Sequence, residues 1–206
     1  MRKAFPALLL VGVVLVAASC ASHKPMGAQF RSAQDMTTQQ TVDGVVWGVD
    51  GLSASEFDRV YDWKFSRRGY SAAILAVRNN SDTPVRLAWQ DVDGAVDPEE
   101  IIQKGQRQIF TRLLAWNAVP IIDLVGWGTL AVGDLVLIGI SVGDAIMAGN
   151  CNGQMTDDIR RQSLRDIVVQ PDRPYEGLVY FRGTPRQLRV NYRHGEQSKQ
   201  VELVWR

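Results

Sequence analysis

Residues 70–90 read YSAAILAVRNNSDTPVRLAWQ, and this stretch decides the fold. Its first part, residues 70–78, is an apolar run typical of a buried strand. The polar segment NNSDTP at 79–84 follows, and its asparagine, serine, aspartate and proline residues favour a turn. Alternation of apolar with polar or small residues then resumes, with the apolar side chains at Val85, Leu87 and Trp89. The stretch therefore predicts two β-strands separated by a polar turn.

The same alternation recurs in other segments of the chain. It is found at Val45, Trp47 and Val49, at Leu188, Val190 and Tyr192, and at Val201, Leu203 and Trp205. Segments 167–170 and 177–181 have the composition of two further short strands. Short strands separated by polar turns favour a mainly β fold, an antiparallel β-sandwich. Trp89 and Trp205 are expected to be largely buried in its core.

The order of strand, NNSD turn and strand within residues 70–90 resembles immunoglobulin-like periplasmic domains. This resemblance rests on a single short stretch of the chain. It implies that the sandwich has immunoglobulin-like character.

The middle of the chain departs from the β pattern. Asp97-Pro98-Glu99-Glu100 is a helix start, with Asp97 as N-cap, Pro98 at the first helical position and Glu100 reaching back. The helix is expected to run to about Leu114. A second helix is expected from a cap at Thr156-Asp157-Asp158 toward Arg165. Residues of about 97–166 are therefore predicted to form a helical insertion between strands.

Residues 113–149 of this insertion are almost wholly apolar and rich in glycine. Gly139 and Gly143 have the G-x-x-x-G spacing that lets two helix backbones approach closely. The uncharged stretches are too short to span a bilayer. Two interpretations remain open. The segment forms a helical hairpin packed on its own domain, or it is a partly exposed element that contacts a partner or the membrane.

The N-terminal residues 1–19 have the features of a targeting segment. Arg2 and Lys3 precede an apolar run from Ala7 to Ala18, and Cys20 follows the small residues at 17–19. Residues 16–20 resemble the lipobox of bacterial lipoproteins, although Ala17 stands where leucine is commonest. The resemblance implies diacylglyceryl transfer to the Cys20 thiol, cleavage before Cys20 and acylation of the new amino terminus. Because Ala21 and Ser22 follow instead of aspartate, it also implies the outer membrane.

The predicted mature chain begins at Cys20 and continues as a flexible tether over residues 20–40, followed by the sandwich at 41–206. Without Arg2 and Lys3, the 23 basic residues fall to 21 against 22 acidic ones, so the formal charge is −1. This balance and the absence of a basic cluster exclude nucleic acid as a partner. Cys151 has no intramolecular partner once Cys20 is acylated, and we interpret it as an inert thiol or, less simply, an intermolecular bridge.

Two motifs could carry chemistry. Residues 139–143 match the G-x-S-x-G pattern of α/β-hydrolases, with Ser141 as nucleophile, Asp166 or Asp172 as acid and His194 as base. However, the several βα units that precede the nucleophile in that fold are not visible here. Residues 91–100 contain five carboxylates, which suits a hard cation, but turn formation and helix capping already account for them.

These observations predict a lipid-anchored, periplasm-facing protein with a non-enzymatic binding or structural role in the cell envelope. Its partners would be the membrane, through the lipid on Cys20, and an envelope protein that contacts the insertion. No metal and no cofactor are expected. The alternative is a small lipid-anchored serine hydrolase that uses Ser141.

Overall fold

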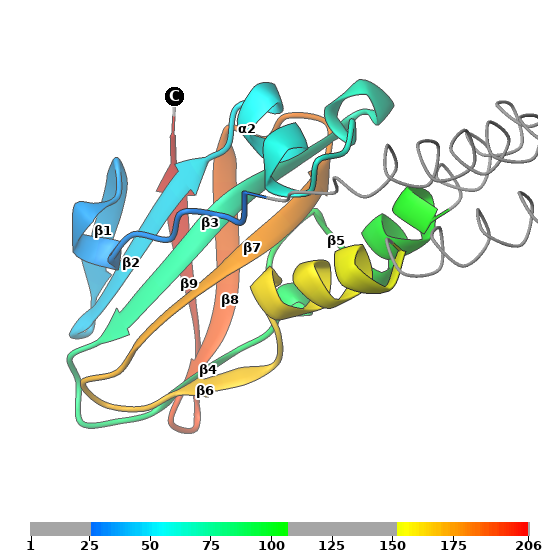
Figure 1. Ribbon diagram of the computed structural model, residues 1–206. Helices are drawn as coiled ribbons and strands as arrows, with labels where there is room; N and C mark the ends of the chain where they lie inside the picture. The colour runs from blue at the N-terminus through cyan, green and yellow to red at the C-terminus, as the bar shows by residue number, and fades with distance from the viewer. Residues whose placement is uncertain (1–25, 107–151, 206) are drawn as a thin grey trace, which may run out of the picture. The chain divides into compact units, whose positions relative to one another are not determined.

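The computed structural model describes residues 26–106 and 152–205, which form a mainly β fold with two antiparallel sheets and, within these ranges, three helices (Figure 1). In the five-stranded sheet the order is β1 (Thr38–Val42), β2 (Val45–Gly51), β3 (Tyr70–Asn79), β7 (Pro174–Arg182) and β5 (Ala95–Val96). In the four-stranded sheet it is β6 (Ile167–Val169), β4 (Val85–Leu87), β8 (Gln187–His194) and β9 (Gln197–Val204). The prediction of antiparallel strands is therefore confirmed.

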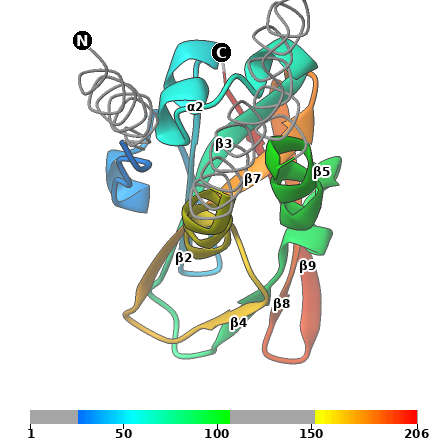
Figure 2. The ribbon, with the colours of Figure 1, turned by 45° about the vertical axis from the view of Figure 1, so that its right-hand side comes forward.

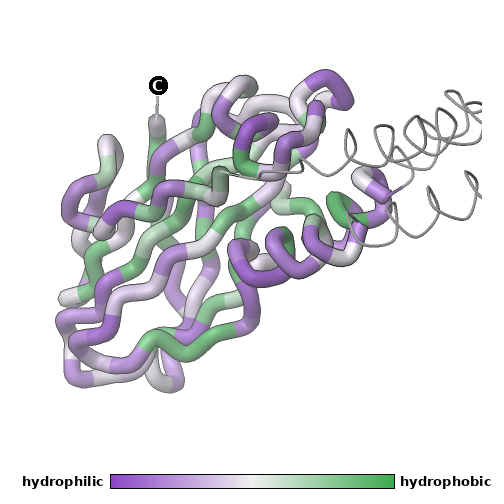
Figure 3. Tube along the Cα trace, viewed as in Figure 1, coloured by the Kyte–Doolittle hydropathy of each residue, from purple (hydrophilic) through white to green (hydrophobic). Residues whose placement is uncertain are grey.

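The two sheets pack face to face through one apolar core. Side chains from both sheets are fully buried there, and examples are Leu75 of β3, Val179 of β7 and Leu188 of β8. The Trp47 and Tyr192 rings join the sheets, with their centroids 4.6 Å apart. Apolar residues follow the strands, and polar residues gather at turns and along residues 152–162 (Figure 3). The predicted alternation thus places one face of each strand in a shared core.

The predicted turn at 79–84 carries the chain from one sheet to the other, because β3 belongs to the five-stranded sheet and β4 to the four-stranded sheet. Asn79 is fully buried at this crossing. Its amide donates to the Thr83 carbonyl at 2.8 Å and to the Val169 carbonyl at 3.1 Å. The buried asparagine therefore ties the turn to the neighbouring strand β6.

The β3 strand is buried on both faces. One face lies in the core between the sheets, and the other carries Tyr70, Ala72 and Ile74 under a layer of helices and turns. We call this second side the outer face. Helix α2 (Ala54–Val60), helical residues 98–102 and helical residues 157–162 lie on it (Figures 1 and 2). No helix in the described ranges is long and apolar enough to cross a membrane.

The first ordered elements begin earlier than predicted. A 3₁₀ turn, η1 (Ala33–Asp35), precedes β1, and β1 starts at Thr38 instead of near Thr41. Ala33 and Met36 are buried against β2. Gly48 of β2 makes room for them, because a Cβ at this position would lie 2.6 Å from the Ala33 carbonyl oxygen. Much of the predicted tether is therefore packed on the domain.

Both tryptophans predicted to be core residues are only partly buried, and both pack against the rim of the core. Strand β4 ends at Leu87, because the Ala88 N–H donates to the Asp91 carboxylate at 2.8 Å and begins the 3₁₀ turn η3 (Trp89–Asp91). Trp89 therefore belongs to a turn instead of a strand. Trp205 follows the end of β9, and its indole lies against Gly51.

Helical residues 98–106 begin at Pro98, as predicted. Helical residues 152–162 begin before the predicted cap, so Thr156 lies inside this helix, and the helix ends before Arg165. The intervening residues 107–151 are outside the described part of the chain, and with them the predicted apolar hairpin.

The Gly48→Ala substitution should lower the free energy of unfolding by about 1–3 kcal/mol, because the added methyl group overpacks against the Ala33 backbone. The measurement is the urea midpoint of the purified protein. The control is Gly153→Ala, where a Cβ meets nothing within 4 Å. Alanine should be neutral there or stabilise the helix by up to about 1 kcal/mol. Equal midpoints for both variants would contradict the packing of residues 33–36 on β2.

Candidate functional site

The helical residues on the outer face flank residues 107–151, which include the predicted apolar segment 113–149. Residues 98–106 follow β5, and residues 152–162 precede β6. The Asp97 carboxylate accepts the Glu99 N–H at 2.9 Å, which caps the first helix as predicted. The second helix ends on the sheet, where the Leu164 N–H donates to the Leu178 carbonyl of β7 at 2.8 Å. We call these two helical stretches the stem.

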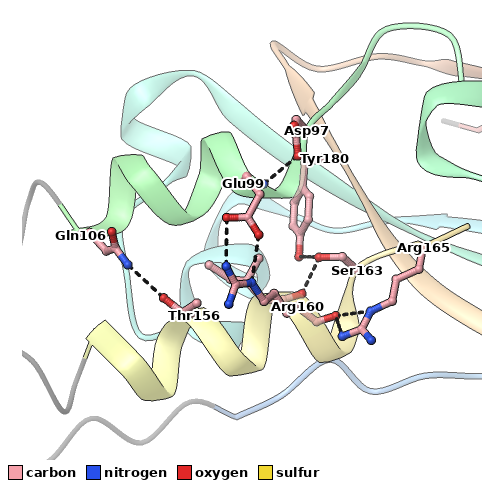
Figure 4. A network of polar contacts seen from close by, with 9 residues as sticks. Asp97, Glu99, Gln106, Thr156, Arg160, Ser163, Arg165 and Tyr180 are labelled. Atoms are coloured by element: carbon pink, nitrogen blue, oxygen red, sulfur yellow. Dashed lines mark hydrogen bonds and ion pairs between the residues drawn. The ribbon is translucent and has the colours of Figure 1, made fainter.

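Ion pairs hold the base of the stem. Arg160 donates to both carboxylate oxygens of Glu99, at 2.9 and 3.2 Å, and thereby joins the two helices (Figure 4). The hydrogen bond that Arg160 donates to Glu99 raises the pKa of Arg160. Both side chains are about half exposed (53% and 49%), so water screens the pair and its contribution is modest. The bidentate pair therefore fixes the alignment of the two helices, and its contribution to the free energy of folding is small.

A second carboxylate ties the first helix to the sheet. Glu100 accepts from Arg182 of β7 at 2.7 Å and from the Tyr70 hydroxyl of β3 at 2.5 Å. Burial, followed by the hydrogen bond to Glu100, raises the pKa of Tyr70. Ile101 and Ile102, the next two residues, are buried. This helix therefore begins on a fixed polar and apolar contact with the five-stranded sheet.

A buried chain of hydroxyl groups lies beneath α2 and the second stem helix. The Tyr61 and Tyr180 hydroxyls are 2.5 Å apart. The Ser163 hydroxyl lies 3.1 Å from the Tyr180 hydroxyl and donates its proton to the Ile159 carbonyl. Burial raises the pKa of Tyr180 to about 12 and that of Tyr61 well above its ordinary value. Both phenols therefore stay neutral at physiological pH, and the chain acts as a structural clamp.

Sequence reasoning missed α2 and this clamp. A signal for the helix was present, since Ser53 and Glu56 form a Ser-x-x-Glu capping box in which each side chain bonds the other's backbone N–H. The rings of Phe57, Tyr61 and Phe65 then pack together on the outer face. The pairing of Tyr61 with Tyr180 spans 119 residues, and no local pattern could have indicated it.

The stem helices are also joined at the last described residue of the first helix, Gln106. The Gln106 amide donates to the Thr156 hydroxyl at 3.1 Å (Figure 4). The last described residue of the first stem helix is therefore hydrogen-bonded to the second stem helix. Thr156, predicted to be a cap, serves as the acceptor of this cross-link.

The residues proposed for chemistry are placed as follows. Cys20, Ser141, Gly139, Gly143 and Cys151 are outside the described ranges. His194, the predicted base, lies at the end of β8 with its Nε2 2.8 Å from the Ser81 hydroxyl, at the turn between the sheets.

The two candidate acids have structural surroundings. Asp166 accepts two hydrogen bonds from Arg86, at 3.1 and 2.7 Å, and the bond from Arg86 lowers its pKa. Asp172 has a positive φ of 58° in the loop before β7, where its N–H donates to the Asn79 carbonyl. Asp166 is thus bonded to Arg86 and His194 to Ser81, and no bond joins Asp166 to His194.

The carboxylates of residues 91–100 are separately engaged and do not converge. Asp91 bonds the Ala88 N–H, Asp97 caps its helix, and Glu99 and Glu100 pair with different arginines. Asp93 faces the Asn191 amide at 3.4 Å. No group of three or more metal-binding side chains is found in the described ranges. The interpretation of this run as turn and cap agrees with these contacts.

One groove in the described part of the chain is polar and lies on the four-stranded sheet. It has a volume of about 520 Å³, and Arg86, Asp166, Asn191 and Arg193 are among its lining residues. The Arg86–Asp166 pair already neutralises part of its charge. Charges of both signs in an open groove specify no ligand class.

Comparison of the chain with known protein families, with characterised proteins and with solved structures finds no significant match. The functional argument therefore depends on the motifs and the geometry of this chain.

The Tyr180→Phe substitution should lower the free energy of unfolding by about 1–3 kcal/mol, because the Tyr61 and Ser163 hydroxyls lose a buried partner. Tyr192→Phe is the matched control. The Tyr192 hydroxyl is buried and has no hydrogen-bond partner within the described residues, so its removal should be neutral or stabilising. Urea unfolding of both variants tests this difference. A loss for Tyr192→Phe as large as that for Tyr180→Phe would argue against the clamp.

The clamp also predicts loss of stability at high pH. The folded pKa of Tyr180, about 12, exceeds the unfolded value of about 10. Its contribution is therefore complete below about pH 10 and is lost as the pH rises toward 12. Unfolding free energies measured across this range should fall less steeply for Tyr180→Phe than for the wild type. The phenolate absorbance should show at least two late-titrating tyrosines, and their titration at the ordinary pKa would contradict the prediction.

Proposed function

We propose that this chain is a lipid-anchored protein of the cell envelope, with its mature form beginning at an acylated Cys20. It faces the periplasm from the outer membrane and has a non-enzymatic binding or structural role. The observation that carries the proposal is the sequence Ala17-Ala18-Ser19-Cys20 after a short apolar run that begins behind Arg2 and Lys3. The described domain starts six residues later at Met26, whose side chain is 62% exposed, so a surface position of the anchor fits the fold.

The finer fold proposal is an immunoglobulin-like sandwich with a helical insertion at about 97–166. The crossing of the chain from β3 to β4 between two packed antiparallel sheets supports the first part. The stem supports the second part, because helical residues 98–106 and 152–162 stand between β5 and β6.

We further propose that the apolar segment between the stem helices contacts a partner protein or the membrane. Polar pairs at Glu99–Arg160 and Gln106–Thr156 join the two helices between which this segment lies in the chain. The glycine spacing of Gly139 and Gly143 suits close packing with another helix.

Replacement of Cys20 by serine should leave the protein unprocessed or soluble, because serine cannot form the thioether. Cells are labelled with a clickable fatty-acid analogue, and wild type and Cys20→Ser are compared by in-gel fluorescence and membrane fractionation. Cys151→Ser is the control and should keep both label and membrane association. Equal labelling of the Cys20→Ser variant and the wild type would overturn the anchor.

The role of the apolar segment is tested by crosslinking the full acylated protein in its own envelope. Gly139→Leu and Gly143→Leu should each reduce a specific crosslinked product more than they lower the melting temperature. Gly153→Leu, in the stem, is the control and should keep the product. If the wild type gives no specific crosslinked product and the two leucine variants fail to fold, the segment only packs on its own domain.

A further inference from the structure

Strand β1 is an outermost strand of the five-stranded sheet, and in the described part of the chain no strand lies beyond it (Figure 1). Its five residues pair with β2 over their whole length. Gln39, Gln40 and Thr41 are exposed, and the preceding turn η1 packs on β2 and β3. One edge of β1 is therefore open to solvent, and we call it the free edge.

The turn after β1 sets the hydrogen-bonding pattern of the strand. Asp43 and Gly44 form a two-residue turn with φ of 51° and 79°, as in the type I′ turns of β-hairpins. The carbonyl of the residue before such a turn accepts from the N–H of the residue after it. Val42 and Val45 are these two residues, so they form a hydrogen-bonded pair of the ladder.

This pair decides which backbone groups point to the free edge. Bonded and non-bonded pairs alternate along an antiparallel ladder, so the backbone groups of Thr38 and Gln40 also point toward β2. The N–H and C=O groups of Gln39 and Thr41 then point away from β2. Among the described residues none of these four groups has a hydrogen-bond partner. The free edge thus presents two donors and two acceptors.

The other outermost strands of the described sheets are protected. Strands β5 and β6 have only two and three residues. Strand β9 is longer but carries Lys199 and Glu202, and its edge faces β1, since the Thr38 hydroxyl donates to the Val204 carbonyl at 3.2 Å. Short strands and charged side chains are the usual means of preventing association between sheet edges. Strand β1 has five uncharged residues and no proline, so it lacks this protection.

The free edge is complementary to itself. A second copy of β1 can lie antiparallel to the first, with a two-fold axis at Gln40. Gln39 then lies opposite Thr41 of the second copy, and the symmetry repeats this pair on the other side of the axis. Both residues of each pair point to the free edge, so each pair can exchange two N–H···O bonds. This register satisfies every open backbone group of both strands.

Electrostatics do not oppose this pairing. The nearest charge in the chain is Asp43, three residues from the axis, and it already pairs with Lys199 at 2.8 Å. The two copies of Asp43 would lie at opposite ends of the paired strands, about 20 Å apart. Salt screens charges at such a separation.

We propose that the free edge of β1 binds β1 of a second copy of this chain, antiparallel and with the two-fold axis at Gln40. The two five-stranded sheets then form one continuous sheet. The contact uses the same surface of both copies and therefore stops at a dimer. It depends neither on the proposed anchor nor on residues 107–151. Because a single strand pair is a small interface, the dimer is weak and forms in a concentration-dependent way.

The register is tested by oxidative crosslinking of the purified full-length protein with Cys151→Ser. Gln40→Cys should give a covalent dimer, because the two Cα atoms at the axis are about 4.5 Å apart, within the range of a disulfide. Gln200→Cys, an exposed glutamine of β9, is the matched control and should give none. The parent without an added cysteine reports any bond through Cys20. No dimer from Gln40→Cys, or equal yields from both variants, overturns the register.

The pairing itself is tested by charge at the axis, with sedimentation velocity of the full-length protein over a concentration series. Gln40→Lys and Gln40→Glu should each lower the association constant by up to about fivefold, because like charges face each other across the strands. An equimolar mixture of the two variants should restore the dimer, which a folding defect would not allow. Gln200→Lys should leave association unchanged. A wild type that is monomeric throughout, or a dimer that ignores Gln40→Lys, overturns the proposal.

Discussion

The burial of β3 on both faces is the constraint on which the rest of the structure depends. A strand that carries Leu75 and Val77 on one side and Tyr70 and Ile74 on the other cannot leave either side in water without a large hydrophobic cost. The four-stranded sheet covers one side. The other side requires a second cover. This cover consists of α2, residues 33–36 and the stem helices. The fold is thus layered around one central strand.

The outer layer is where polar contacts do most to define the structure. The core between the sheets is almost wholly apolar, whereas the outer layer contains the hydroxyl chain of Tyr61, Tyr180 and Ser163 and the carboxylates Glu99 and Glu100. Apolar burial is non-directional, but these hydrogen bonds have defined geometries. They therefore align the base of the stem with the five-stranded sheet.

The proposed anchor and the proposed contact segment are linked to the same layer. The Met26 N–H donates a hydrogen bond to the Arg59 carbonyl of α2, and the Ala28 N–H donates one to the side chain of Gln162 in the second stem helix. Under the proposed function, the chain would therefore enter this layer from the anchor and leave it toward the apolar segment.

The sequence by itself determined the local features. Period-two alternation predicted the strands around Trp47, Val85, Val190 and Val201, and the Asp97-Pro98 pair predicted the helix start, because both signals depend on near neighbours in the chain. The lipobox is likewise a local signal, and it stays a prediction. Only the tertiary structure decided which sheet each strand joins, since alternation specifies a buried face but no partner strand. It also decided that residues 33–36 pack against Gly48, that Trp89 and Trp205 lie at the rim of the core, and that Tyr61 meets Tyr180. Those contacts join residues far apart in the chain, and their geometry exists only once both sheets and the outer layer have assembled.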